Sequence, residues 1–195
     1  CVDRFSSKFR WRKLKLKQFM KLMNQFPKPT KFLHSLVDSI VVSIRDFELK
    51  IPNGIRNIAI DDKFNQEIKP SNTLPDKLHR LIFGYYFNQE IRPHSLPDNL
   101  HTLEFGWNFD REIKPNTLPK NLHTLEFGYD FNHEIKPKSL PDNLHTLRLG
   151  WGFDQWIKCN AFPASLRLLE CTEYLKDNLL DKDALPQHLE IRVYY

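Results

Sequence analysis

Cysteine is scarce in this sequence, which has only Cys1, Cys159 and Cys171 among its 195 residues. An odd number of widely spaced cysteines does not suit the dense disulfide framework of a small secreted domain, so reduced thiols are expected. Cys171 falls at an inward position of a predicted strand, which favours packing over thiol reactivity. Cysteine usage therefore favours a location in the cytoplasm.

Several motifs that would indicate chemistry or a membrane are also missing. The sequence has no apolar stretch of about 18 residues, no signal-like hydrophobic run, no glycine-rich phosphate loop and no Cys-x-x-Cys pair. No asymmetric set of nucleophile, base and orienting group is present either. We therefore expect no enzyme, no cofactor and no metal site.

Positive charge is concentrated in one segment. Residues 1–31 contain ten basic residues and one acidic residue, a net charge of +9, whereas residues 32–195 have a net charge of −4. The basic residues closest together are Arg10, Arg12, Lys13, Lys15 and Lys17. Apolar residues at helical spacing predict an amphipathic helix that ends before a proline: Leu16, Phe19, Met20, Met23 and Phe26. This segment is either a cap over the first turn of the fold or a contact for nucleic acid, anionic lipid or a partner helix.

A period of 22 residues dominates the rest of the chain. Leu96–Gly106 returns almost unchanged as Leu118–Gly128 and again as Leu140–Gly150. Each turn also has a Phe, an Asn or Asp directly after it, and an Ile four residues after it; the Phe positions are Phe64, Phe87, Phe109, Phe131 and Phe153. Repeats of this length stack to build one continuous core. The sequence therefore predicts a solenoid, with the Asn and Asp side chains turned inward to bond the backbone of neighbouring coils.

The pattern within each turn predicts a leucine-rich-repeat-like coil. In Leu-x-x-Leu-x-Phe-Gly, alternate residues point inward, as in a short strand. Leu103 and Phe105 should face the core, and Thr102 and Glu104 should face outward. Successive strands would pair in parallel at about 4.8 Å, while two prolines per turn leave an extended or 3₁₀ return segment. A glycine ends each strand, where we expect it to permit a sharp turn.

These residues resemble a known family. The combination of Phe-Asn-x-x-Ile with Leu-Pro-x-x-Leu-x-x-Leu-x-Phe-Gly is similar to the FNIP repeat of social amoebae and giant amoebal viruses, over residues 51–193. The resemblance implies a binding scaffold, and a location in the host cytoplasm if the protein is viral. We divide the chain into a basic N-terminal helix and cap, residues 1–50, and a solenoid, residues 51–195, and expect a monomer.

The same resemblance raises the question of a ubiquitin ligase, because FNIP proteins often carry an F-box near the N-terminus. The sequence begins with Cys1, and its Phe5–Trp11 segment is weakly similar to the last helix of an F-box. If an F-box lies upstream, the resemblance implies a substrate receptor of a Skp1-cullin-type ligase, with the solenoid holding the target. Without one, the solenoid would still be a binding module.

Two columns of residues are candidate partner-binding sites. The residue after each strand-ending glycine is aromatic: Tyr85, Trp107, Tyr129 and Trp151. Such side chains either anchor a partner or stack to stabilise neighbouring turns. On the outward face of the strands, the second column comprises Glu104, Glu126, Arg148 and Glu170. These are either partner contacts or a solvated face.

Two further columns receive structural interpretations. His79, His101, His123 and His145 occupy one position of consecutive turns. A row of ligands does not converge as a metal site requires, and protonated rings that face one another should weaken folding below about pH 6. Acidic and basic residues flank each inward Ile, and we expect them to form adjacent exposed rows: Glu67, Glu90, Glu112 and Glu134, and Lys69, Arg92, Lys114 and Lys136.

The sequence thus predicts a protein that acts through recognition. Our first interpretation is a protein–protein interaction module. The alternative is a scaffold that binds nucleic acid or membrane through the basic segment, whose affinity should fall steeply with salt.

Overall fold

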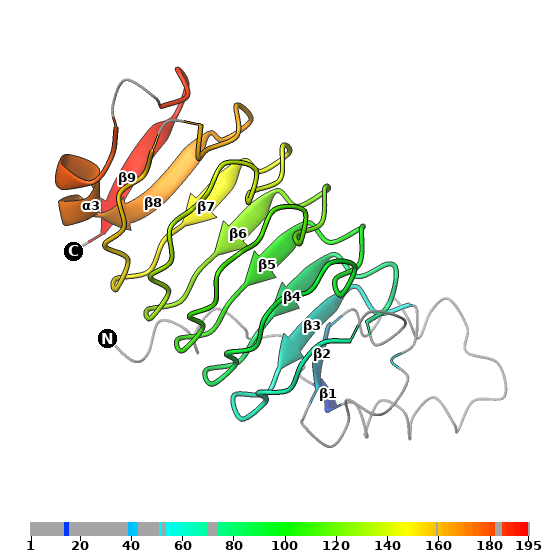
Figure 1. Cartoon of the computed structure of the whole chain (residues 1–195). Coiled ribbons are helices and arrows are strands. Elements are labelled where there is room, and N and C mark those ends of the chain that lie inside the picture. Colours follow the sequence, from blue (N-terminus) through cyan, green and yellow to red (C-terminus); the bar gives the residue numbers. More distant parts are fainter. Residues whose placement is uncertain are drawn as a thin grey trace, which may run out of the picture.

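The computed structural model describes residues 14–15, 39–42, 51, 54–69, 74–158, 160–181 and 185–194. In these residues, nine strands form one parallel sheet whose order in space is their order in the chain. The strands are β1 (Leu14–Lys15), β2 (Ser39–Val42), β3 (Asn57–Ile60), β4 (Arg80–Ile82), β5 (Thr102–Glu104), β6 (Thr124–Glu126), β7 (Thr146–Arg148), β8 (Leu168–Thr172) and β9 (Glu190–Tyr194). The coils stack side by side along one axis, as Figure 1 shows. The predicted solenoid is confirmed.

Strand register follows the repeat. Leu103 pairs with Leu81 on one side and with Leu125 on the other, and each interior strand is flanked in the same way. Leu103 and Phe105 are buried, whereas Thr102 and Glu104 are partly exposed. The alternation of inward and outward side chains is therefore as predicted.

The core is a stack of apolar layers, one per coil. In the coil of β5, the buried members are Leu96, Leu100, Leu103, Phe105 and Phe109. Phe105 and Phe109 stack with ring centroids 3.7 Å apart, and Phe109 lies 6.2 Å from Phe131 in the next coil. Full burial of one such side chain contributes about 1.5–3 kcal/mol. A single coil cannot enclose these rings, so neighbouring coils stabilise one another.

Buried hydroxyls and exposed amides satisfy backbone groups in the loops. Ser95 Oγ, Thr117 Oγ1 and Ser139 Oγ each donate to the carbonyl oxygen three residues earlier, at 2.7 Å. Asn99 Nδ2 and Asn121 Nδ2 donate to backbone carbonyls of the preceding coil, at 2.8 and 3.0 Å. The loops are thus tied both within and between coils.

The glycines that end the strands have a role beyond the predicted turn. No described glycine has a positive φ; the positive values occur in the linking loops at His94, Asn116, Lys138 and Asn160. Instead, a Cβ placed on Gly128 would lie 1.9 Å from the carbonyl oxygen of Gly106. The glycine column, Gly84, Gly106, Gly128 and Gly150, therefore allows close approach between coils. A turn does follow these glycines, since the backbone N–H of Phe109 donates to Gly106 O at 3.3 Å, but this turn does not use a positive φ.

The return segments have no regular helix in the described coils before β8, and the 3₁₀ alternative is not observed there. After β8, the short helix α3 (Glu173–Asn178) takes the place of the extended path and contains the buried Leu175. Thr172 caps α3 by accepting a hydrogen bond from the backbone N–H of Leu175, at 3.3 Å. Thr172 stands where earlier coils have the strand-ending glycine. A residue with a Cβ thus stands in the glycine column at the coil where the chain departs from the repeat.

The predicted helix Leu16–Phe26 and most of the basic segment lie outside the described residues. The strands β1 and β2 extend the parallel sheet before residue 51. The division at residue 51 and the cap remain predictions.

Candidate functional site

A column of exposed aromatic residues lies at the carboxyl ends of the strands. We call it the aromatic stripe: Tyr85, Trp107, Tyr129 and Trp151. Their exposed fractions are 41%, 39%, 43% and 53%. Tyr85 and Trp107 stack at 5.7 Å, Trp107 and Tyr129 at 4.5 Å, and Trp151 is tilted against Tyr194 at 5.2 Å. The rings therefore contact one another or a neighbouring aromatic residue and also remain exposed, so partner binding stays a prediction.

The glycine column determines where the stripe lies. Each stripe residue directly follows a glycine whose coil sits against the previous one. The backbone N–H of Asn108 donates to Tyr85 O, and that of Asp130 donates to Trp107 O, at 3.0 and 2.9 Å. This fixed backbone gives the stripe a rigid base.

The outward residues of the strands form a row of partly buried ion pairs, which we call the sheet-face row: Glu104, Glu126, Arg148 and Glu170. Arg148 contacts Glu126 at 3.0 Å and Glu170 at 2.7 Å, and Arg80 contacts Glu104 at 2.5 Å. Burial opposes the charge of Arg148, but the two carboxylates outweigh it and raise the pKa of this guanidinium. The row is therefore charged, ordered and largely compensated within the chain.

His79, His101, His123 and His145, which we call the histidine ladder, stack on one another. Ring centroids are 4.8 Å apart for His79 and His101, and 5.0 Å for each of the next two pairs. The Nδ1 atoms of His101 and His123 lie 2.7 Å from the carbonyl oxygens of Asn99 and Asn121. Burial, together with the charges of His101 and Arg56, lowers the pKa of His79. In the described part of the chain, no three His, Cys, Asp or Glu residues come together as metal ligands.

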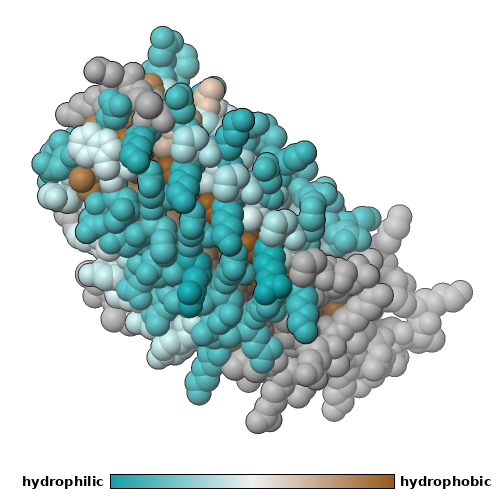
Figure 2. All heavy atoms as spheres, viewed as in Figure 1, coloured by the Kyte–Doolittle hydropathy of each residue, from teal (hydrophilic) through white to brown (hydrophobic). Residues whose placement is uncertain are grey.

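The exposed acidic and basic rows join neighbouring coils. Arg92 contacts Glu67 at 2.8 Å, Lys114 contacts Glu90 at 2.5 Å, and two equivalent pairs follow at Lys136–Glu112 and Lys158–Glu134. Hydrogen bonding from these lysines lowers the pKa of Glu90, Glu112 and Glu134. Figure 2 shows hydrophilic side chains in parallel rows over the side of the solenoid that faces the viewer.

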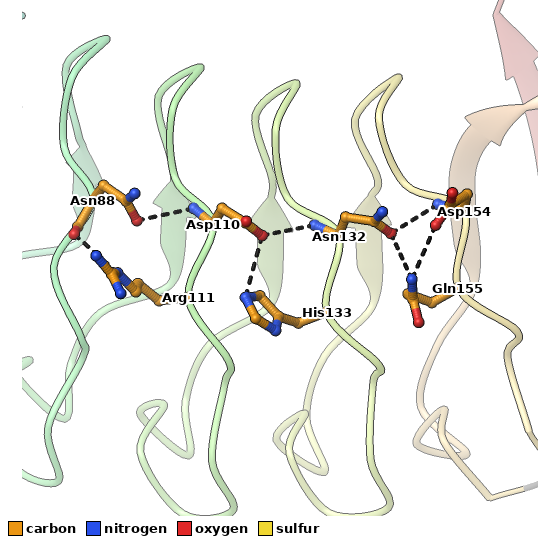
Figure 3. Close-up of polar contacts among 7 residues, drawn as sticks. All are labelled: Asn88, Asp110, Arg111, Asn132, His133, Asp154 and Gln155. Carbon is orange, nitrogen blue, oxygen red and sulfur yellow. Dashed lines mark hydrogen bonds and ion pairs between the residues drawn. The ribbon is translucent and has the colours of Figure 1, made fainter.

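A ladder of Asn and Asp side chains links the return segments (Figure 3). Asn88 Oδ1 accepts from the backbone N–H of Asp110, and the same contact repeats from Asp110 to Asn132 and from Asn132 to Asp154, each at 3.1 Å. Asp110 Oδ1 also lies 3.2 Å from His133 Nε2. The predicted bonding to the neighbouring coil is present, but these side chains are partly or fully exposed instead of inward.

The remaining candidates are less prominent. Cys171 is buried, and its burial raises the pKa of its thiol to about 11. Of the basic segment, only Lys15 falls within the described residues, as part of β1. In the part of the chain that the structure describes, no helix is long and apolar enough to cross a bilayer. The basic segment, the aromatic stripe and the sheet-face row remain predicted binding sites.

Comparison with known proteins agrees with the repeat and the fold. The family model described as FNIP Repeat matches residues 48–86, 87–130 and 131–170. The chain is also similar to a solved structure entitled "The crystal structure of CroV588 a novel circular LRR protein structure", with a TM-score of 0.67 and 32% sequence identity. That match covers 80% of this chain and 23% of the other, so this chain spans about a quarter of that protein's length. Among curated proteins there is no match.

Proposed function

The chain belongs to the FNIP-repeat family, and on this premise we propose that its solenoid is a non-enzymatic module that binds another protein. The observation that carries the proposal is the aromatic stripe, in which Tyr85, Trp107, Tyr129 and Trp151 are each 39–53% exposed on a rigid backbone. Tyr and Trp are the residues that most often supply binding energy at protein interfaces. Isolated exposed apolar residues are ordinary, but a contiguous column of them marks a contact surface.

The sheet-face row would supply specificity beside this anchor. Glu126, Arg148 and Glu170 hold one another in place, so a partner would meet charges that are already oriented. Pre-ordered side chains lose less conformational entropy on binding. The column varies in charge from coil to coil, whereas the buried Leu column beneath it is nearly constant. A constant core with a variable face is suited to the selection of one partner.

The regularity of the polar side chains favours recognition over catalysis. Enzyme sites need different groups that converge on one reacting atom. In the described coils, His, Glu, Lys and Asn instead recur at the same position of successive turns. Each row is used to join neighbouring coils, as in Glu90–Lys114 and His101–His123.

Within this proposal, the finer role is that of a substrate receptor in a Skp1-cullin-type ubiquitin ligase. It rests on family resemblance and requires an F-box upstream of Cys1. The solenoid would then hold the target while the F-box contacts Skp1. We further propose that the protein acts in the cytoplasm, as a monomer, where the single buried thiol of the described chain stays reduced.

The test is affinity purification from an amoebal lysate, with the complete natural polypeptide and the 195-residue chain as baits. Each bait is also prepared as Trp107→Ser/Tyr129→Ser, to remove the stripe, and as His188→Gln, a matched exposed substitution away from it. We expect a protein that both baits and the His188→Gln control retain and that both stripe variants lose. Capture of Skp1 and a cullin by the complete polypeptide alone would support the ligase role.

The alternative function is a scaffold that contacts nucleic acid or anionic lipid through residues 1–31. The net charge of +9 favours this alternative. Its affinity should fall steeply with salt, because each neutralised phosphate releases a counterion. Recovery of nucleic acid or lipid without any stripe-dependent protein would replace our first proposal with this one.

A further inference from the structure

The histidine ladder is part of a longer column of basic side chains along the amino ends of the strands. The backbone N–H of His79 donates to Arg56 O at 2.7 Å, and that of Arg167 donates to His145 O at 2.8 Å. The same hydrogen bond joins the ladder residues to one another. An arginine therefore stands at each end of the ladder. We call the six residues the basic column: Arg56, His79, His101, His123, His145 and Arg167.

The basic column is open to solvent and has no acidic partner within the described chain. Its two arginines and the outer rings, His79 and His145, are exposed, and the two central rings are partly exposed. Among the described residues, the histidine that contacts a carboxylate is His133, which lies outside the column. On the return segments, by contrast, each basic residue of the series Lys114, Lys136 and Lys158 is paired with a glutamate. The charge of the column is therefore available to a ligand.

The charged groups around the column nearly cancel. Arg80, beside His79, is paired with Glu104, and Glu190, beside Arg167, is paired with Arg192. The remaining sheet-face row is compensated by its own ion pairs. The loops that lead into the strands have three exposed acidic and two exposed basic residues, a net charge of −1: Asp76, Asp98, Asp142, Lys77 and Lys120. The two arginines give the column a charge of +2, which four protonated rings would raise to +6. This edge of the sheet is therefore weakly positive at neutral pH and strongly positive in acid.

The protons that the central rings gain add at a defined atom. The Nδ1 atoms of His101 and His123 lie 2.7 Å from backbone carbonyl oxygens. Because a carbonyl oxygen only accepts, Nδ1 carries the hydrogen of each neutral ring, and Nε2 takes the second proton and becomes a donor. The two rings are stacked 5.0 Å apart, so these donors recur at about the spacing of the coils. A carboxylate, which has two accepting oxygens, can bridge neighbouring rings.

The geometry of the column favours an acidic peptide over a nucleic acid. Six coils at about 4.8 Å form a single file about 24 Å long, which about seven extended residues would span. The faces of the central rings are covered by their neighbours, so bases cannot stack on them as they do in single-strand binders. Residues 32–195 also have a net charge of −4, which opposes a long polyanion more than a short acidic segment.

We propose that the basic column binds an extended acidic segment of a protein, and that this segment binds more tightly as the histidine ladder takes up protons. The proposal goes beyond the proposed function, because the column lies at the edge of the sheet opposite the aromatic stripe and does not depend on it. Arg56 and Arg167 attract carboxylates at any pH, and the protonated rings between them add further contacts. Each contact between opposite charges about 4 Å apart in water changes affinity about fivefold at low salt.

The test measures the binding of a short acidic peptide to the full chain at low salt, at about pH 7.5 and about pH 5.5. The probe is a rhodamine-labelled peptide of alternating glutamate and serine, followed by fluorescence anisotropy; its control has glutamine in place of glutamate. Glutamate is ionised at both pH values. Residues 1–31 contain no histidine, so peptide bound there contributes equally at both. The variants are His101→Gln/His123→Gln and the matched control His133→Gln, whose ring lies on the return segments (Figure 3).

We expect wild type and His133→Gln to bind the acidic peptide at least about tenfold more tightly at the lower pH, and the double variant to lose this gain. A second readout follows the ring signals of the wild-type chain by NMR. The peptide should move the titration midpoints of His101 and His123 to higher pH by about 0.7 unit, which corresponds to a fivefold preference for the charged ring. The midpoint of His133 should not move.

Equal affinity at both pH values, or an equal gain in the double variant, would overturn the proposal, as would unmoved ring midpoints. A larger acid-dependent gain for an oligothymidylate of the same charge would overturn it in favour of a nucleic acid. The NMR readout uses the wild-type chain, so it does not depend on the folding of a variant. No residue of the aromatic stripe is changed, so failure here is distinct from a failure of the proposed function.

Discussion

The histidine ladder predicts that acid weakens the fold by a defined amount. The rings of His79, His101, His123 and His145 are 4.8–5.0 Å apart. Two unit charges 5 Å apart in water repel by about 0.8 kcal/mol, and the water value applies because these rings reach solvent. Repulsion from His101 therefore opposes protonation of His79 by about 0.8 kcal/mol at low salt. Salt will reduce this repulsion.

The direction follows from proton linkage. The pKa of His79 is lowered in the folded chain, by burial and by the charges of His101 and Arg56. The unfolded chain, with a histidine pKa near 6.5, then binds more protons than the folded chain as the pH falls. The contribution of His79 to the free energy of unfolding is therefore fully present above about pH 7.5. It is lost as the pH falls through 6.5 toward the lowered pKa of His79 in the folded chain. The stability that the Glu–Lys pairs contribute is lost at lower pH than that of His79, because the pKa values of Glu90, Glu112 and Glu134 are lowered.

The assay compares urea unfolding at about pH 7.5 and pH 5 in low salt. His101→Gln/His123→Gln removes all three neighbouring pairs, and His188→Gln controls for the loss of an exposed histidine outside the ladder. We expect wild type to lose about 0.8 kcal/mol more free energy of unfolding than the double variant between the two pH values, and the His188→Gln control to follow wild type. Equal losses in wild type and the double variant would show that the stacked histidines do not weaken the fold in acid.

Three other predictions concern single positions. Gly128→Ala should lower the free energy of unfolding by about 3 kcal/mol or more, because the new Cβ would lie 1.9 Å from Gly106 O. A thermal midpoint close to that of wild type would show that the coils are not in close contact there. Asn132→Ala should lower the free energy of unfolding by about 1 kcal/mol, because the backbone N–H of Asp154 loses its acceptor. Asn132→Asp keeps the accepting Oδ1 atom, so equal urea midpoints for the two variants would contradict a stabilising role for this hydrogen bond. Cys171 should resist a thiol reagent at neutral pH until the protein unfolds, because burial raises the pKa of its thiol to about 11, and rapid labelling of the folded Cys159→Ser/Cys1→Ser chain would exclude that burial.

The period of the sequence was sufficient to predict the solenoid, since each coil repeats the same inward residues. Leu81, Leu103, Leu125 and Leu147 occupy one buried column because identical spacing gives identical register. The stacking of the histidines and of most of the aromatic stripe follows from the same reasoning. One dimension of the structure, the order along the axis, is thus encoded directly by the repeat.

Contacts between coils were harder to predict, because they depend on how far a side chain reaches. Lys114 pairs with Glu90, which is 24 residues away, and not with a residue one period away. Likewise, Arg148 bridges Glu126 and Glu170, so a row that the sequence presents as free charge is largely compensated. The sequence predicted only a turn at the glycine column. The close contact of these glycines with the backbone of the preceding coil cannot be read from the spacing of residues. The buried hydroxyls of Ser95, Thr117 and Ser139 recur every 22 residues and could have been found from that recurrence.

The most direct test of the binding module measures the affinity of the captured partner for three purified chains at low and high salt. The chains are wild type, Trp107→Ser/Tyr129→Ser and the His188→Gln control, each verified as folded by circular dichroism. The stripe variant should lose at least tenfold in affinity, about 1.4 kcal/mol, while the control should bind as wild type does. Equal affinity of the stripe variant and wild type would contradict the assignment of the aromatic stripe as the anchor of recognition.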